Sequence, residues 1–222
     1  YLGRAAILEM HFQDWAAVRR DLDRAFALEP NNPRVMAALA FALSWQGRVP
    51  EAIEAYERVL DVDPLRENAL TSLAYLWLYA GRYPDARRAL ARAQELNAQS
   101  VFAQLLLGEL ELLEGRPDAS LAVFEKIEDE AFRLYGIAIA QHSRRDRARS
   151  DAALRELIAK NSADAAYQVA AVYAWRGEND RAFEWLERAR VQRDGGLLSL
   201  LTDSIVRPLQ ADPRWRPFVE KV

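Results

Sequence analysis

The 222-residue sequence contains no cysteine and only two histidines, His11 and His142. Without cysteine the chain forms no disulfide and has no thiolate for catalysis or zinc binding. The two histidines lie far apart, and neither has a second ligand at the short spacing typical of a metal site. We therefore expect no metal site. The lack of cysteine fits the cytoplasm, which we favour, and also the periplasm.

Long apolar runs and blocks of one charge are also lacking. Charged residues interrupt every apolar stretch well before the roughly 18 residues that a membrane-spanning helix needs, and the N-terminal sequence YLGRAAILEMHF has no basic region followed by a long apolar core. The 30 basic and 33 acidic side chains alternate along the chain and give a net charge of −3. We expect neither membrane insertion nor a nucleic acid partner.

Catalytic patterns are lacking as well. There is no phosphate-binding loop, and Glu109 and Glu111 stand two positions apart in a predicted helix, so they point to different faces and form no acid/base pair. We therefore expect no enzymatic activity and no cofactor. With 51% apolar residues, the chain nevertheless has enough material for a substantial core.

A repeat dominates what is present. Gly47, Gly81 and Gly115 are spaced 34 residues apart, and each is followed by arginine. Apolar residues at intervals of four and three flank these glycines on both sides, which is the pattern of helices with one buried face. Glycine suits the left-handed end of a helix, and Pro50 and Pro84 suit the first turn of the next helix. Each unit is therefore predicted to be a helical hairpin.

One unit departs from the repeat. The distance from Gly115 to Gly177 is 62 residues, rather than the 68 of two repeats, and residues 132–163 have no glycine at their turn. We interpret residues 130–160 as a degenerate hairpin preceded by a shortened loop.

The hairpins resemble the tetratricopeptide repeat, in which small, aromatic and proline positions recur in a fixed order. Ala52, Tyr56, Val59 and Pro64 match the closing half of that pattern. Other units match at Ala5, Ala6, Leu22, Ala25, Pro30, Leu107, Gly108, Phe124, Ile127, Val169, Ala170, Tyr173, Gly177, Ala182, Leu186 and Ala189. The resemblance implies an all-α, right-handed superhelical solenoid of about six hairpins over residues 1–193, the first of them truncated.

The two ends of the chain differ from the array. Residues 194–222 predict two short helices separated by the stretch from Pro208 to Pro213, which we expect to cap the apolar side of the last hairpin. The sequence LQADPRWRPFVEKV resembles the closing segment of bacterial tetratricopeptide arrays that follow winged-helix, cyclase or kinase output domains. Tyr1 is not methionine, and the first unit begins partway into a helix, so we expect an upstream domain.

The resemblance also implies a binding groove on the concave side, lined by the first helix of each hairpin. His11, Trp45, Tyr79, Leu113 and Trp175 occupy one register of these helices, and an aromatic stripe there is typical of a partner site. The alternative is that such rings only wedge between hairpins. The predicted peptide-binding groove comprises Arg34, Phe41, Trp45, Asn68, Tyr75, Tyr79, Leu105, Tyr167, Gln168 and Trp175.

These patterns favour a protein interaction module that binds a peptide or helix with apolar anchors, as the C-terminal array of a larger bacterial regulatory or assembly protein. The Lys, Asn and Arg set with which some family members clamp a terminal carboxylate is absent. The alternative is a structural scaffold whose surfaces build a homo-oligomer.

Overall fold

The computed structural model describes residues 15–222, and every regular element in that range is a helix. The first is α2 (Trp15–Leu28). Five helix pairs follow: α3 (Pro33–Trp45) with α4 (Val49–Val62), α5 (Glu67–Tyr79) with α6 (Tyr83–Leu96), α7 (Val101–Leu113) with α8 (Pro117–Phe124), α9 (Glu130–Ser143) with α10 (Arg147–Asn161), and α11 (Ala166–Trp175) with α12 (Asn179–Gln192). The all-α prediction is confirmed. The first helix of the first predicted hairpin, with His11, lies outside the described residues.

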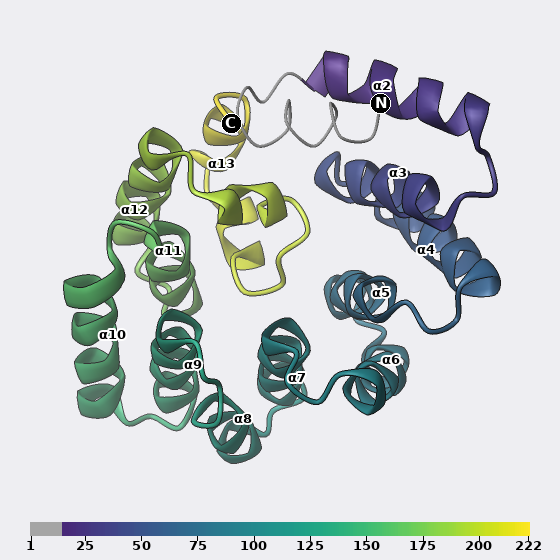
Figure 1. Ribbon diagram of the computed structural model, residues 1–222. Helices are drawn as coiled ribbons and strands as arrows, with labels where there is room; N and C mark the ends of the chain where they lie inside the picture. Colours follow the sequence, from purple (N-terminus) through teal and green to yellow (C-terminus); the bar gives the residue numbers. More distant parts are fainter. Residues whose placement is uncertain (1–14) are drawn as a thin grey trace.

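The pairs stack in sequence order into a curved, right-handed solenoid (Figure 1). The first helices of the pairs, α3, α5, α7, α9 and α11, line the inner side of the curve, and α4, α6, α10 and α12 lie outside them. Each helix contacts its hairpin partner and the next hairpin, because neither helix alone can bury its apolar face. The inner helices therefore define the concave side of the molecule.

The hairpin turns explain the 34-residue spacing of the glycines. Gly47, Gly81, Gly115 and Gly177 all have left-handed backbones, with φ between +69° and +76°. Such a backbone ends the first helix of each pair, and a side chain there would be strained. In the degenerate hairpin Arg145 takes this position, with φ of +65°.

Small residues five positions after each turn let the paired helices approach closely. The side chains at this position are completely buried, and in two hairpins they are hydroxyls that bond the facing helix. Ser120 donates to the carbonyl oxygen of Gly108 at 2.7 Å, and Ser150 donates to that of Ala138 at 2.6 Å. The five residues are Ala52, Ala86, Ser120, Ser150 and Ala182.

The shortened spacing before Gly177 comes mainly from a helix and not from the loop that the sequence suggested. α8 has 8 residues, whereas α4, α6 and α12 have 14. α8 ends at Phe124, whose completely buried ring fills the space beside Gly108 of α7 and Gly136 of α9. Because both of these residues lack a side chain, α9 packs closely against α7 and α8.

Candidate functional site

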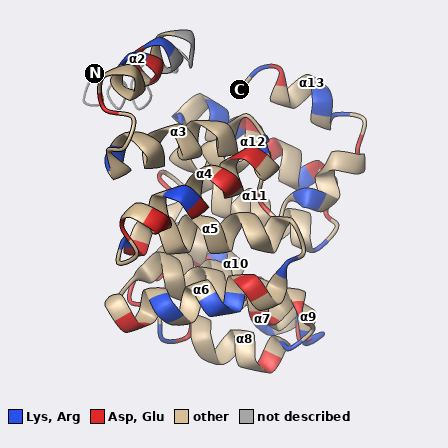
Figure 2. Ribbon diagram, turned by 90° about the vertical axis from the view of Figure 1, so that its right-hand side faces the viewer, with Lys and Arg blue, Asp and Glu red and all other residues tan. Residues whose placement is uncertain are grey.

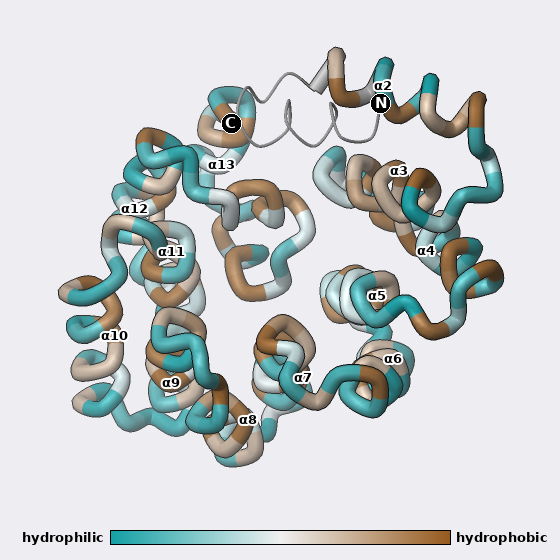
Figure 3. The backbone as a smooth tube through the Cα atoms, in the orientation of Figure 1, coloured by the Kyte–Doolittle hydropathy of each residue, from teal (hydrophilic) through white to brown (hydrophobic). Residues whose placement is uncertain are grey.

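The concave side of the array is occupied by the C-terminal segment, which we define as residues 194–222. It contains η1 (Gly195–Ser199), η2 (Arg207–Ala211) and α13 (Trp215–Val219), three short helical pieces where the sequence predicted two. The segment leaves the last hairpin, crosses the inside of the curve and returns (Figure 1). Figure 3 shows that much of the part facing the inner helices is hydrophobic.

One side of the C-terminal segment packs on the last hairpin. The rings of Phe218 and Phe183 meet edge to face at 6.3 Å. At the start of the segment, Asp194 accepts a hydrogen bond from the backbone N–H of Tyr167 at 2.9 Å. A side chain on Gly196 would collide with the Tyr167 ring, so glycine permits the close approach to α11.

The other side of the segment reaches the first half of the array. The Tyr75 hydroxyl of α5 donates to the carbonyl oxygen of Ser199 at 3.1 Å. At the end of the same helix, Arg207 donates to the carbonyl oxygen of Tyr79 at 3.1 Å, and its guanidinium lies 5.2 Å from the Tyr79 ring centre. Gln210 donates to the Tyr79 hydroxyl at 3.3 Å. The segment therefore bridges hairpins far apart in the array, beyond the terminal hairpin that the sequence predicted it to cap.

Apolar burial holds the middle of the segment in place. Ile205, Val206 and Leu209 are completely buried and belong to the same core cluster as α9 and α11. Burying each such side chain stabilises the fold by about 1.5–3 kcal/mol. The C-terminal segment is thus part of the core rather than a ligand loosely seated in a groove.

The predicted groove residues fall into four groups. Six line the two cavities described below or the small gap between them, and Tyr79 contacts the segment as described above. Arg34 and Asn68 are exposed in the first turns of α3 and α5 and line neither cavity. Trp175 lies between two hairpins, where its Nε1 donates a hydrogen bond to Ser143 of α9 at 2.9 Å. The six lining residues are Phe41, Trp45, Tyr75, Leu105, Tyr167 and Gln168.

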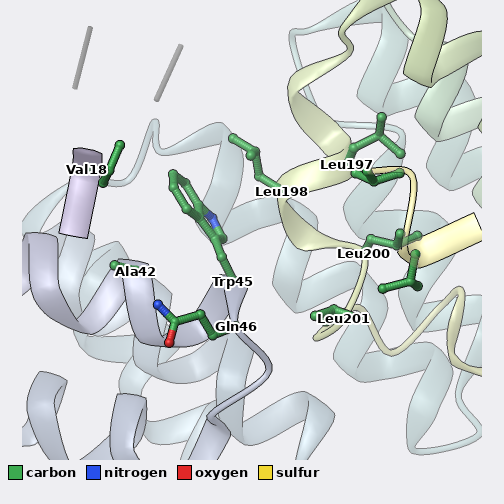
Figure 4. Close-up of a pocket in the computed structure, with 10 residues that line it drawn as sticks. Val18, Ala42, Trp45, Gln46, Leu197, Leu198, Leu200 and Leu201 are labelled. Carbon is green, nitrogen blue, oxygen red and sulfur yellow. The ribbon is translucent and has the colours of Figure 1, made fainter. Parts of the chain in front are cut away.

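The first cavity, which we call the Trp45 pocket, has a volume of about 220 Å³. Figure 4 shows Trp45 at the end of α3 on one side and the leucines of the C-terminal segment on the other. Phe41, one turn before Trp45, has its ring centre 4.2 Å from that of Trp45 and is 38% exposed. The lining residues are Val18, Ala42, Trp45, Gln46, Leu197, Leu198, Leu200, Leu201, Val219 and Val222.

The second cavity, which we call the Glu109 cavity, has a volume of about 200 Å³ and a largely apolar lining that contains several polar groups. It lies between α5, α7, α9, α11 and the C-terminal segment. Inside it, Tyr135 donates to Glu109 Oε1 at 2.8 Å, and Tyr167 donates to Asp203 Oδ2 at 2.9 Å. The lining residues are Tyr75, Phe102, Leu105, Leu106, Glu109, Phe132, Tyr135, Tyr167, Gln168, Ala171, Gly196, Ser199 and Asp203.

Two glutamates of α7 show how differently the protein treats buried charge. Glu109 and Glu111 are equally buried, at 7% exposure each, and point to different faces as their spacing predicted. Although burial opposes it, hydrogen bonds from Arg116 and Arg87 lower the pKa of Glu111. Burial, together with the negative charge of Asp203, raises the pKa of Glu109 to about 8. Glu109 has no cationic partner within residues 15–222.

The sequence did not single out Glu109, Tyr135 or Asp203 as members of one site. Glu109 was considered together with Glu111, and Asp203 belongs to a segment that was expected to cap the last hairpin. Among the described residues, no group of three or more His, Asp or Glu side chains is arranged to hold a metal ion. No helix in the described part of the chain is long and apolar enough to cross a membrane.

Sequence comparison identifies the family. Tetratricopeptide repeat profiles match residues 10–76 and residues 71–132, which together span more than half of the sequence. The chain belongs to the tetratricopeptide repeat family. Members of this family are typically protein interaction modules rather than enzymes. A comparison with curated proteins found no match.

Solved structures of tetratricopeptide repeat proteins share the fold. A protein from Parabacteroides merdae superimposes with a TM-score of 0.70 and 19% identity, covering 90% of this chain and 82% of its own. PilW, described as a widely conserved type IV pilus biogenesis factor, has a TM-score of 0.67 and 14% identity, covering 90% of this chain and 96% of its own. Pseudomonas aeruginosa pilF has a TM-score of 0.62 and 16% identity, covering 90% of this chain and 93% of its own. At these identities the likeness extends to the fold alone.

Proposed function

We propose that this tetratricopeptide repeat protein binds a peptide or helix of a partner protein, and that an apolar side chain of the partner enters the Trp45 pocket. The observation that carries the proposal is the pocket itself, in which a tryptophan of the inner helices faces a row of leucines across an open space. Aromatic residues beside apolar pockets supply much of the binding energy at protein interfaces.

The Trp45 pocket is the part of the concave side that best suits a partner, because the C-terminal segment already contacts Tyr75, Tyr79 and Tyr167. A partner segment lying along α3 would reach the exposed ring of Phe41 and the rim residue Gln46. Apolar anchors would supply affinity there, and Gln46 would offer a hydrogen bond for orientation. The predicted roles of Arg34, Asn68 and Trp175 in such binding stay predictions.

Other features support an interaction module that does not bind nucleic acid. Positive and negative side chains are interspersed over the helices in Figure 2, whereas nucleic acid binding favours a basic patch. A structural relative, YrrB, is described as a tetratricopeptide repeat protein with an unusual peptide-binding site; it has a TM-score of 0.51 and 15% identity, and covers 81% of this chain and 95% of its own. We further propose that the array works within a larger bacterial regulatory or assembly protein.

Peptide selection tests the proposal. Peptides selected from a random display library on the folded protein should share a bulky apolar residue. Trp45→Ala should then weaken the binding of the selected peptide about thirtyfold, equivalent to ~2 kcal/mol. Val191→Ser is the matched control, because Val191 is 71% exposed on α12 and lines neither cavity. Fluorescence anisotropy gives the affinities, and circular dichroism checks folding.

Two outcomes would overturn the proposal. One is a folded Trp45→Ala variant that binds the peptides as tightly as the parent. The other is a homo-oligomer, measured by light scattering, that Trp45→Ala converts to a monomer. That second result would assign the Trp45 pocket to self-association.

A further inference from the structure

The Glu109 cavity contains two buried carboxylates that no cation of the described residues balances. Glu109 is 7% exposed and Asp203 is 8% exposed, and neither makes an ion pair with any residue between positions 15 and 222. An ionised carboxylate is strongly disfavoured inside a protein unless it is paired. The other buried glutamate of α7, Glu111, is paired with Arg87 and Arg116. The lack of a cationic partner therefore distinguishes Glu109 and Asp203 from Glu111.

A third polar group points to the same place. The Oε1 atom of Gln168 is buried and, among the described residues, has no hydrogen-bond partner. Gln168 lines the Glu109 cavity together with the two acids. Buried polar atoms are nearly always hydrogen-bonded, so an unbonded oxygen on a residue of the cavity lining indicates a missing donor. The cavity thus offers acceptors from α7, α11 and the C-terminal segment and lacks a donor for Gln168.

Aromatic rings form much of the remaining wall. They are Tyr75, Phe102, Phe132, Tyr135 and Tyr167. Rings attract cations through their electron-rich faces. Phe102 is 44% exposed, which gives the cavity a solvent-accessible rim.

We propose that the Glu109 cavity binds a guanidinium group, with Glu109 and Asp203 as its counter-ions and Gln168 Oε1 as a third acceptor. The group belongs either to an arginine side chain of a partner protein or to a small guanidino compound. The Glu109 cavity shares no lining residue with the Trp45 pocket, so this proposal does not depend on the proposed function.

The shape and chemistry of the cavity favour guanidinium over other cations. A guanidinium carries five N–H donors in one plane and stacks on aromatic rings, whereas an ammonium has three donors and is more strongly hydrated. Acceptors from three different elements suit several donors spread over a plane. A divalent metal would need at least one further ligand of the usual type, and none is grouped there within the described part of the chain.

Isothermal titration calorimetry on the complete chain tests the proposal with three probes. N-acetylarginine methylamide represents an arginine side chain, and agmatine represents a small guanidino compound. N-acetylcitrulline methylamide has nearly the shape of the arginine probe but no charge. We expect at least one guanidinium probe to bind and the citrulline probe to bind at least about tenfold more weakly, because hydrogen bonds to charged groups are stronger than neutral ones. The tighter of the two guanidinium probes identifies the source.

Two glutamate variants provide a matched comparison. Glu109→Gln keeps the acceptor for Tyr135 and removes the charge, so it should weaken binding of the guanidinium probe about tenfold or more. Glu111→Gln is the control, because Glu111 is equally buried on the same helix but lies outside the cavity. Asp203→Asn, which retains an acceptor for the Ile205 N–H, is a second test should Glu109→Gln fail to fold.

The pH dependence adds a readout that a purely structural role would not give. Binding should strengthen as pH rises from 6 to 9, because the cation needs ionised carboxylates and burial raises the pKa of Glu109 to about 8. The other titratable groups facing it are Asp203, Tyr75, Tyr135 and Tyr167. No binding of either guanidinium probe in the millimolar range, equal binding of the citrulline probe, or unchanged affinity in folded Glu109→Gln would overturn the proposal.

Discussion

The Tyr75 hydroxyl donates a hydrogen bond to the Ser199 carbonyl oxygen at 3.1 Å, across 124 positions of the sequence. Thr202, in the same loop of the C-terminal segment, donates to the Tyr75 oxygen at 3.3 Å. A single side chain of the second described helix pair thus holds a segment that is itself buried against the last pair. This contact joins two parts of the array that have no neighbouring hairpin in common.

Removing this hydroxyl should loosen the bridge. We expect Tyr75→Phe to lower the free energy of unfolding by about 1 kcal/mol, because the Ser199 carbonyl and Thr202 lose a partner and the ring stays in place. Urea denaturation measures the effect. Tyr83→Phe is the control, since the Tyr83 hydroxyl makes no hydrogen bond with any residue from position 15 onward. Equal stability of the two variants would mean that the Tyr75 bond contributes nothing.

The ring of Phe124 leaves no room for a side chain at Gly136 of α9. A Cβ atom on Gly136 would collide with the ring, and a Cβ on Gly108 would come within 2.5 Å of it. We expect Gly136→Ala to destabilise the protein by about 1–3 kcal/mol, the usual range for overpacking, despite the better helix propensity of alanine. Differential scanning calorimetry provides the comparison. If Gly136→Ala melts at or above the parent temperature, the packing around Phe124 is looser than described.

The degenerate hairpin carries a strained turn that glycine would relieve. Arg145 has φ of +65°, a conformation that costs a non-glycine residue roughly 1–2 kcal/mol. Replacing Arg145 by glycine would remove this cost, but the greater flexibility of glycine in the unfolded chain offsets part of the stabilisation. We therefore expect Arg145→Gly to stabilise the protein by up to about 1 kcal/mol in chemical denaturation. Arg144→Gly, at a residue with φ of −76°, should instead destabilise it. A destabilised Arg145→Gly variant would contradict the prediction.

Glu109 should make the protein less stable at alkaline pH. Burial raises its pKa in the folded protein to about 8, from an ordinary value of 4.5, so the folded state binds more protons than the unfolded state between these values. Stability from Glu109 is therefore fully present below pH 4.5 and is lost as pH rises through about 8. Glu109→Gln should remove this loss.

The measurement is the difference in unfolding free energy between the parent and Glu109→Gln from pH 5 to pH 9. Taking the difference cancels groups that titrate in both proteins, such as His142, whose pKa burial lowers. A difference that stays constant over this range would contradict a raised pKa for Glu109.

The helices and turns could be predicted from the sequence because they depend on neighbouring residues. Gly47, Gly81 and Gly115 mark left-handed helix ends, and small residues such as Ala52 mark close helix contacts. Arg145 shows the limit of this reasoning, since the same backbone forms there without glycine. The turn keeps this backbone because α9 and α10, the helices on either side of it, pack against each other.

The candidate site was less predictable because it depends on contacts between distant parts of the chain. The periodic pattern placed Tyr75, Leu105 and Tyr167 on the concave side, where the structure has them. It carried no information about the path of the C-terminal segment, which has no repeat. The hydrogen bond from Tyr167 to Asp203 was therefore not predictable from any local pattern.

The bridge from α5 to the C-terminal segment also affects how the chain folds. In a simple repeat array most contacts are local, so hairpins form and melt from the ends with little dependence on the rest. Here Tyr75 and Tyr79 form hydrogen bonds to residues 124 to 131 positions away. Contacts of this separation require closure of a long loop, which slows folding. We therefore expect the array to fold and unfold as a single cooperative unit, and not repeat by repeat.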